Sequence, residues 1–335
     1  MPQASLRKEH FGKFVAAVSK GRKFFGPLEC SDGVQLAELS PQDVPAFEYG
    51  NFTLPPKRFF LPRSEVIAVH GPGGMAATPP SQERVVLFGV RPCDAMSLTY
   101  MDKVFIDETY VDPYYRSRRE NTLIITLACR QPAVTCFCAS VKGCPAGTAG
   151  ADIAASDLGD ALLLESITDA GHAFLAEHAG LMGKPSTAQL KARDSQHADA
   201  GKKMSPVDVE KLPARLQAAF ESKTWDDISQ RCLGCGVCTF LCPTCHCFGL
   251  HDEQVGPVQR RVRAQDACAF PTFTLEASGH NPRTRQGARM RQRVMHKFCY
   301  AAENFGELFC VGCGRCIRSC PANLDIRQTL AEVPE

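Results

Sequence analysis

The sequence predicts an α+β protein: a mixed α/β N-terminal domain, then a helical linker and a cysteine-rich C-terminal domain. Three observations support this order. Short β-branched runs alternate with a helix-compatible stretch early in the chain, polar helical periodicity follows, and the C-terminal part holds most of the 18 cysteines. We place the boundaries at residues 1–165, 166–222 and 223–335.

Four short apolar runs in the N-terminal domain have the composition of buried strands. They are Glu65–His70, Arg84–Val90, Thr122–Ala128 and Ala161–Glu165. The stretch that follows Pro92 has helical spacing, so strand, turn and helix form the expected local unit.

Two further elements are expected from periodicity. One is an amphipathic helix near the N-terminus, because Leu6, His10, Phe14 and Val18 would share one helical face. The other lies in the linker, where Val209, Leu212, Leu216 and Phe220 recur at helical spacing.

A Gly/Pro-rich segment, residues 70–81, separates two of the expected strands. It lacks the G-x-G-x-x-G pattern and no helix follows it, so a hairpin tip is favoured over a phosphate-binding loop.

The most informative pattern is a cysteine run that occurs twice, each time ending in Cys-Pro. The copies are Cys232-x-x-Cys235-x-x-Cys238-x-x-x-Cys242 and Cys310-x-x-Cys313-x-x-Cys316-x-x-x-Cys320. In bacterial ferredoxins with two [4Fe–4S] clusters, the fourth cysteine of each run ligates the other cluster. We therefore predict a ferredoxin-like dicluster domain with a long insert. Cluster I takes Cys232, Cys235, Cys238 and Cys320, and cluster II takes Cys310, Cys313, Cys316 and Cys242.

Zinc and disulfides are the competing interpretations of these cysteines. Thiolates select zinc as well as iron–sulfur clusters, but zinc sites use pairs of cysteines rather than a threefold step repeated twice. Disulfides are disfavoured because the chain is long and shows no secretory leader. Spacing and duplication together favour [4Fe–4S] clusters.

The insert between the two runs holds more cysteine and histidine, together with a basic stretch at residues 283–293. Cys245, His246 and Cys247 could bind a metal, but their closeness to Cys242 favours packing against a cluster. The basic stretch is interpreted as a solvated face, with compensation of cluster charge or docking on an acidic partner as the alternative.

Composition excludes several classes of function. The net charge of +2 gives no reason to expect nucleic-acid binding. No apolar segment approaches the length of a membrane span, and a cytoplasmic location is expected.

Several strings narrow the family beyond the ferredoxin pattern. They are Phe88–Asp94 (FGVRPCD), Cys136–Cys138 (CFC), Arg231–Cys238 (RCLGCGVC), Cys242–Cys245 (CPTC) and His296–Phe298 (HKF). Together they resemble the iron–sulfur β subunit of cytosolic NAD(P)-linked nickel–iron sulfhydrogenases and the corresponding dicluster iron–sulfur protein of anaerobic sulfite reductase.

The resemblance implies a non-catalytic electron-transfer subunit of a hetero-oligomeric complex. Its partners would be a flavin subunit that handles NAD(P)H and a catalytic subunit of the hydrogenase or sulfite reductase type. The chain itself carries no Rossmann fingerprint, which is consistent with a flavin and a nicotinamide held elsewhere.

A third [4Fe–4S] cluster is predicted in the N-terminal domain. Cys93 and Cys129 each follow an expected strand, and neighbouring strands would bring both thiols to one edge of the sheet. Cys136 and Cys138 follow on the next loop, with Cys144 as a reserve ligand. Buried structural thiols are the alternative.

Two other functions remain open. The chain could reduce disulfides or sulfur through a reactive cysteine, or act as a component of a complex like heterodisulfide reductase, although the paired Cys-Cys-Gly strings of that family are missing. Alternatively, the clusters could only stabilise the fold.

Overall fold

The computed structural model describes residues 3–71, 73–202 and 204–334. The chain divides into two compact units. The first contains residues 1–56, 81–206 and 311–313, and the second contains residues 57–80, 207–310 and 314–335. The segment 57–80, which the sequence places in the N-terminal domain, thus groups with the C-terminal residues.

The first unit is built on a mixed seven-stranded sheet of order β1-β9-β8-β7-β6-β2-β3. Its central strands β2, β6, β7 and β8 run parallel, and β3, β9 and β1 add antiparallel edges. The strands are β1 (Gln3–Arg7), β2 (Lys23–Cys30), β3 (Gly33–Glu38), β6 (Val85–Val90), β7 (Thr122–Leu127), β8 (Ile153–Asp157) and β9 (Ala161–Ser166).

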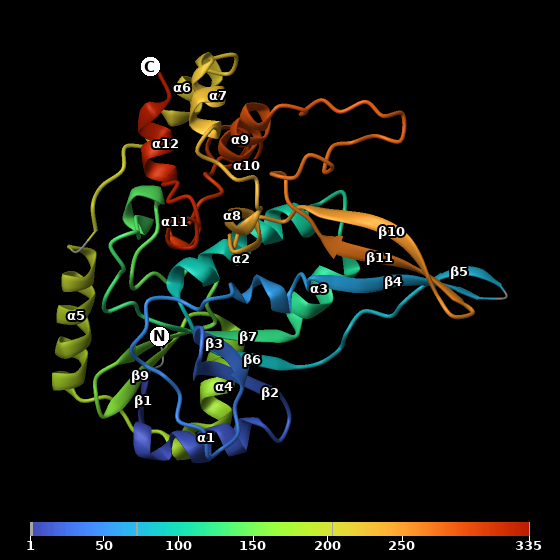
Figure 1. The fold of residues 1–335 in the computed structure, drawn as a ribbon. Helices are drawn as coiled ribbons and strands as arrows, with labels where there is room; N and C mark the ends of the chain where they lie inside the picture. The colour runs from blue at the N-terminus through green and yellow to red at the C-terminus, as the bar shows by residue number, and fades with distance from the viewer. Residues whose placement is uncertain (1–2, 72, 203, 335) are drawn as a thin grey trace. The chain divides into compact units, whose positions relative to one another are not determined.

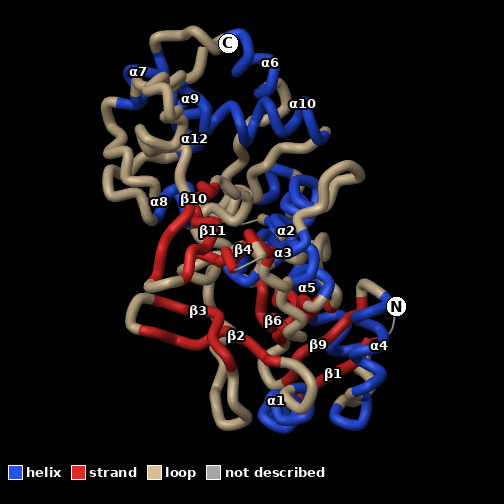
Figure 2. Tube along the Cα trace, turned by 90° about the vertical axis from the view of Figure 1, so that its right-hand side faces the viewer, coloured by secondary structure: helices blue, strands red, loops and turns tan. Residues whose placement is uncertain are grey.

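Helices cover both faces of this sheet (Figures 1 and 2). The apolar side chains of α1 and α4 join those of the sheet in one buried core, which includes Phe14, Phe88 and Phe174. On the other side, α2 and α3 pack against β7. The helices are α1 (Phe11–Val18), α2 (Pro92–Phe105), α3 (Pro113–Glu120), α4 (Asp169–Glu177) and α5 (Thr187–Gly201), with short 3₁₀ turns η1 (Lys8–His10), η3 (Cys138–Val141) and η4 (Ala179–Leu181).

The sequence predictions for this unit are largely confirmed. The three runs near residues 84–90, 122–128 and 161–165 are strands β6, β7 and β9, and the stretch after Pro92 is α2. The N-terminal helix is shorter than expected, because Leu6 lies on β1, whose backbone pairs with β9. Periodicity alone could not anticipate this long-range pairing.

The second unit contains an antiparallel sheet of order β10-β11-β4-β5. The strands are β4 (Ser64–Gly71), β5 (Gly74–Ala77), β10 (Phe248–Val255) and β11 (Val258–Gln265). The run Glu65–His70 is confirmed as a strand, and the Gly/Pro segment after it is a β4–β5 hairpin, apart from Pro72, which lies outside the described residues. The sequence does not predict the β10–β11 hairpin.

The rest of the second unit consists of short helices around the cysteine runs. They are η2 (Pro56–Phe59), α6 (Leu212–Ala218), α7 (Thr224–Ser229), α8 (Val237–Phe240), α9 (Gln286–Met295), the π-helix η5 (His296–Tyr300), α10 (Ala301–Phe305), α11 (Arg315–Arg318) and α12 (Ile326–Glu332). Helix α6 confirms the periodicity predicted in the linker. Within the described ranges, no helix has the length and apolar character needed to cross a membrane.

Candidate metal centres

The two cysteine runs have matching backbone geometry. In each, a glycine with positive φ precedes a one-turn helix: Gly236 at 75° before α8, and Gly314 at 72° before α11. Gly234 and Gly312 also have positive φ, 67° and 59°. This left-handed conformation favours glycine, so the Cys-x-Gly-Cys-Gly pattern specifies the same tight loop twice.

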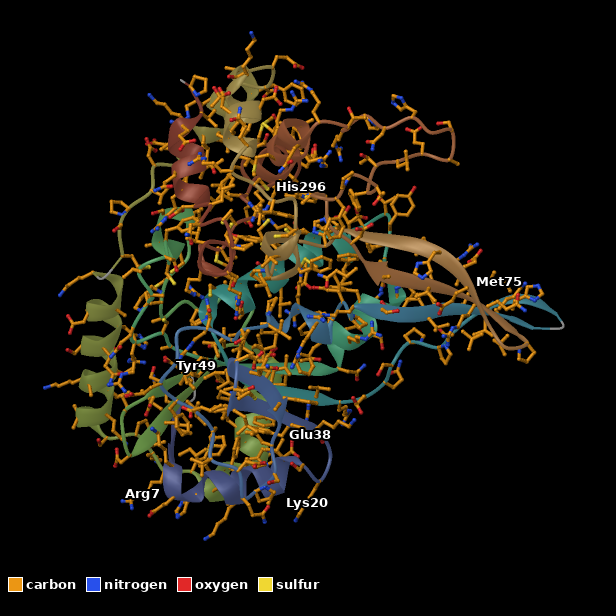
Figure 3. All side chains as sticks on the ribbon, viewed as in Figure 1. Arg7, Lys20, Glu38, Tyr49, Met75 and His296 are labelled. Atoms are coloured by element: carbon orange, nitrogen blue, oxygen red, sulfur yellow. The ribbon has the colours of Figure 1, made fainter. Side chains whose placement is uncertain are left out.

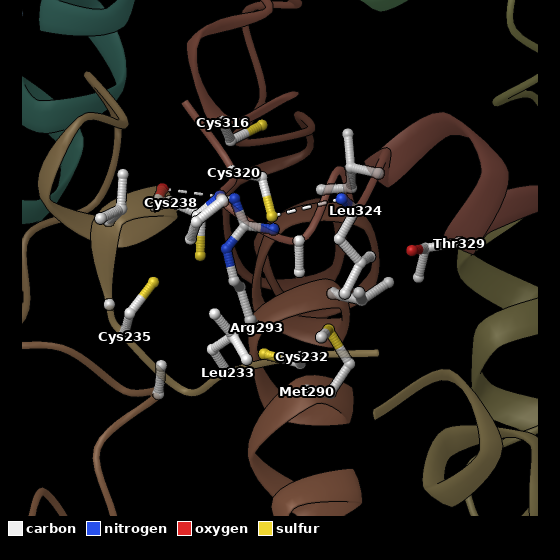
Figure 4. Close-up of a pocket in the computed structure, with 17 residues that line it drawn as sticks. Cys232, Leu233, Cys235, Cys238, Met290, Arg293, Cys316, Cys320, Leu324 and Thr329 are labelled. Carbon is white, nitrogen blue, oxygen red and sulfur yellow. Dashed lines mark hydrogen bonds between the residues drawn. The ribbon is translucent and has the colours of Figure 1, made fainter. Parts of the chain in front are cut away.

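The predicted ligands of cluster I meet at one pocket in the second unit (Figure 4). Cys232 and Cys235 come from the loop after α7, Cys238 from α8, and Cys320 from the segment after α11. Cys316 also lines this pocket, which therefore holds one thiol more than a cubane needs. The geometry is consistent with the crossed assignment of Cys320 to the first run.

Backbone N–H groups donate to two of these sulfur atoms. Gly234 N–H donates to Cys232 Sγ at 3.3 Å, and Leu324 N–H donates to Cys320 Sγ at 3.2 Å. Such bonds stabilise negative charge on a ligand thiolate and tune the potential of a bound cluster.

A buried guanidinium reaches the same pocket from α9. Arg293 Nη2 donates to the carbonyl oxygen of Cys238 at 3.4 Å, while its buried Nε has no hydrogen-bond partner among the described residues. Burial alone would lower the pKa of Arg293, but the nearby Cys238 and Cys316 sulfurs raise it well above its usual value. A buried cation with an unused donor fits a pocket whose occupant is anionic, as a thiolate-ligated [4Fe–4S] cluster is.

A second buried cation contacts Cys242, the fourth cysteine of the first run. Lys297 Nζ donates to Cys242 Sγ at 3.0 Å, to Thr244 Oγ1 at 2.8 Å and to the Phe309 carbonyl oxygen at 3.1 Å. The lysine lies in the π-helix His296–Tyr300, a rare distortion often found at functional sites.

The protonation of this pair follows from the same contacts. A hydrogen bond with Cys245, supported by the charges of Lys297 and Arg293, holds the pKa of Cys242 well below its ordinary value. Burial opposes the charge on Lys297, yet the Cys242 and Cys245 sulfurs raise its pKa. Cys242 is therefore a thiolate, the form that ligates iron.

The second run is divided between the two units. Cys310 and Cys316 belong to the second unit, whereas the three-residue segment 311–313 belongs to the first. That segment is held by Asn51 Nδ2, which donates to the Cys313 carbonyl oxygen at 2.8 Å, and by Phe137 N–H, which donates to the Gly312 carbonyl oxygen at 2.9 Å.

The carboxyl ends of β6 and β7 bring the N-terminal cysteines to one edge, because the two strands are parallel neighbours. Arg91 fixes this edge. Its guanidinium donates to the carbonyl oxygens of Leu127 and Ala128 at 3.0 Å and lies 3.7 Å above the ring of Tyr49 (Figure 3). Cys93 follows Arg91 in the first turn of α2, and Cys129 follows β7.

A group of thiols surrounds Cys138 at this edge. Burial raises the pKa of Cys138 to about 12, and neighbouring Cys136, Cys129 and Cys144 add to the shift. The reserve ligand Cys144 thus belongs to the group as much as the two cysteines predicted first. Cys136 Sγ also donates to the carbonyl oxygen of Cys313 at 3.7 Å.

In the described ranges, no three Cys, His, Asp or Glu side chains converge as ligands of a single metal ion do. Cubane ligands differ in this respect, because each thiolate binds its own iron.

Comparison with known proteins identifies the family. A model of the 4Fe-4S dicluster domain matches residues 231–324. Sulfhydrogenase 2 subunit beta of Pyrococcus furiosus is 34% identical over 348 aligned residues, which cover 100% of this chain and 99% of that protein. The chain belongs to the family of sulfhydrogenase beta subunits. No solved structure matches it.

Membership of the sulfhydrogenase beta family, together with the dicluster domain, makes this chain an iron–sulfur electron-transfer subunit with [4Fe–4S] clusters. The family resemblance drawn from the sequence strings is therefore confirmed.

Sequence reasoning does not reveal the buried cations of the family's dicluster domain. A solvated face is the favoured interpretation of the stretch 283–293, but Arg289 and Arg293 are buried. Lys57, far away in the sequence, is also buried, and its Nζ donates to the Cys245 carbonyl oxygen at 2.7 Å. The one available signal is a cluster of arginines, close to cysteine runs, with no acidic residues between them.

Proposed function

We propose that this subunit relays electrons, one at a time, between a flavin subunit that handles NAD(P)H and a catalytic subunit of the hydrogenase or sulfite reductase type. The complex would be a soluble, cytoplasmic hetero-oligomer, and this chain would turn over no substrate alone. The relative's printed name, a beta subunit of a sulfhydrogenase, supports such an assembly. The observation that carries the proposal is the pocket in which four cysteine thiols meet a buried arginine.

The ligand sets are those expected from the cysteine runs. Cluster I would bind Cys232, Cys235, Cys238 and Cys320. Cluster II would bind Cys310, Cys313, Cys316 and Cys242. When bound, [4Fe–4S] clusters supply one-electron redox chemistry at potentials set by charge, hydrogen bonding and solvent access.

The protein's own residues would set those potentials. Arg293 and Lys297 place positive charge beside the thiolates and so favour the reduced state, in which the clusters are more negative. Gly234 N–H and Leu324 N–H act in the same direction through their bonds to sulfur. Apolar side chains such as Val294 and Ile326 line the pocket and limit the access of water.

We also propose a third [4Fe–4S] cluster in the first unit. Its ligands would be four of Cys93, Cys129, Cys136, Cys138 and Cys144. The parallel β6–β7 edge and the mutual influence of four of these thiols support it. The contact of Cys136 with Cys313 would give electrons a short path between this group and the second run.

Iron content and optical reduction test the relay. Anaerobically purified full-length protein should bind roughly 8 irons per chain with two cubanes and roughly 12 with three. Dithionite should bleach the visible charge-transfer band reversibly and produce coupled paramagnetic signals. Zinc at the repeated loops, or protein that stays colourless after anaerobic reconstitution, would refute the proposal.

Purification of the native assembly tests the partners. Its co-migrating subunits should include one that binds flavin and one that carries the catalytic metal site. A preparation in which the chain migrates alone, with full iron content, would contradict the proposed complex.

A further inference from the structure

A second pocket in the second unit contains thiols outside the two ferredoxin runs. It has a volume of about 320 Å³ and lies among the start of β10, the loop after β11, helix α9 and the π-helix that begins at His296 (Figure 3). Its chemistry-bearing side chains are Cys245, His246, Cys247, Cys268, Arg283, Arg293, His296 and Lys297.

The β10–β11 hairpin brings two of these thiols together. Phe248 pairs with Gln265 at the open end of the hairpin. Beyond that pair, Asp266 N–H donates to the Cys247 carbonyl oxygen at 2.9 Å. Cys247 and Cys268, on the two departing chains, are thereby placed side by side, and their side chains are hydrogen-bonded to each other.

The environment of the pair distinguishes its two members. The Cys268 backbone N–H also bonds to the Cys247 sulfur, and Thr239 Oγ1 lies 3.9 Å from Cys268 Sγ. The hydrogen bond from Cys247, with help from Arg293 and Lys297, lowers the pKa of Cys268 to about 6. The same bond raises the pKa of Cys247.

This arrangement is that of an attacking thiolate beside a resolving thiol. A thiolate is the nucleophile in disulfide exchange, and a second thiol within reach then releases the mixed disulfide. Cys245, the remaining thiol of the pocket, is occupied by its hydrogen bond to Cys242.

We propose that Cys268 and Cys247 form a redox-active dithiol that exchanges with small anionic disulfides in this pocket. Cys268 Sγ attacks one sulfur of the bound disulfide, forming a mixed disulfide and releasing the first thiolate. Cys247 then loses its proton and attacks Cys268 Sγ, which forms the Cys247–Cys268 disulfide and releases the second thiolate. In total, two cysteine thiols are oxidised and one disulfide is reduced to two thiols.

The charges of the pocket choose the substrate class. Arg283, Arg293 and Lys297 all line it, so a disulfide that carries carboxylates is favoured over one that carries amines. The pocket volume suits a small molecule rather than a folded protein partner. Return of the protein disulfide to the dithiol takes two electrons and two protons, and only this return step rests on the relay proposed above.

The test uses the anaerobic, iron-loaded, full-length protein and two probes of opposite charge. Dithiodiglycolate, an anionic disulfide, should release two thiols per chain and leave a Cys247–Cys268 linked peptide, detected by mass spectrometry after alkylation of free thiols. Cystamine, a cationic disulfide, should react more slowly. Recovery of both cysteines in alkylated form after dithiodiglycolate treatment would overturn the proposal, as would an equal or faster reaction with cystamine.

Variants assign the two roles. Cys247→Ser should trap the probe on Cys268 as a mixed disulfide and release one thiol instead of two, and Cys268→Ser should form neither product. Cys299→Ser is the matched control, because Cys299 is a buried thiol that contacts Glu303 instead of this pocket.

Iron content distinguishes this proposal from a further cluster. Both pocket variants should retain the iron content of the wild type, and loss of iron from either would make these cysteines cluster ligands and refute the dithiol. The exchange consumes no electrons from the clusters. Its failure in iron-loaded protein would therefore overturn the dithiol and leave the relay standing.

Discussion

Replacement of Lys297 by methionine should lower the potential of the cluster that Cys242 ligates. The ammonium lies 3.0 Å from Cys242 Sγ and is buried, so its charge is poorly screened. With the added electron centred roughly 6 Å from Nζ and an effective dielectric constant of about 20, the lost attraction is about 2.8 kcal/mol, or about 120 mV for a one-electron couple.

The assay is an anaerobic redox titration followed by electron paramagnetic resonance, with iron content as the check on folding. Lys297→Arg retains the charge and should stay closer to the wild-type potential. Lys297→Gln retains a donor without the charge, so it separates the hydrogen bond from the electrostatic effect.

Two results would refute this reasoning. One is a Lys297→Met protein with full iron content and an unchanged potential for both clusters. The other is a shift confined to the cluster that Cys242 does not ligate, which would mean that the assignment of Cys242 is wrong.

Three further predictions concern the pocket and the fold. Cys320→Ser should remove about four irons per chain, measured by colorimetric iron assay, because one cubane loses a ligand. Gly312→Ala should lower the thermal midpoint more than Gly306→Ala: both have positive φ, 59° and 72°, but only at Gly312 would the new methyl meet backbone atoms, at 2.5 Å. Glu65→Gln should destabilise the protein by about 3–5 kcal/mol in denaturant unfolding, because it leaves the buried Arg263, now 2.8 Å from Glu65 Oε1, without its counter-charge.

Each of these has a clear contrary outcome. Full iron in Cys320→Ser would remove that residue from cluster I. Equal midpoints for the two alanine variants would mean that the loop at Gly312 can relax around a methyl group. An unchanged unfolding free energy in Glu65→Gln would mean that Arg263 finds another partner or reaches water.

The sequence by itself determined the repeated cysteine loops, the family and the parallel strands that lead to Cys93 and Cys129. These features are local: thiolates two residues apart can serve one cubane, and a buried strand needs only a short run of β-branched residues. Periodicity likewise identified α2 and α6 without reference to any distant contact.

Only the tertiary structure decided which charges are buried and which thiols are paired. Arg293 and a solvated arginine look alike in sequence, because burial depends on chain segments far away. Cys247 and Cys268 meet only because a hairpin that the sequence did not reveal closes between them, and Lys57 reaches the Cys245 carbonyl from far along the chain. Ligand spacing is set by neighbouring residues, whereas the electrostatic setting of those ligands is set by contacts between distant ones.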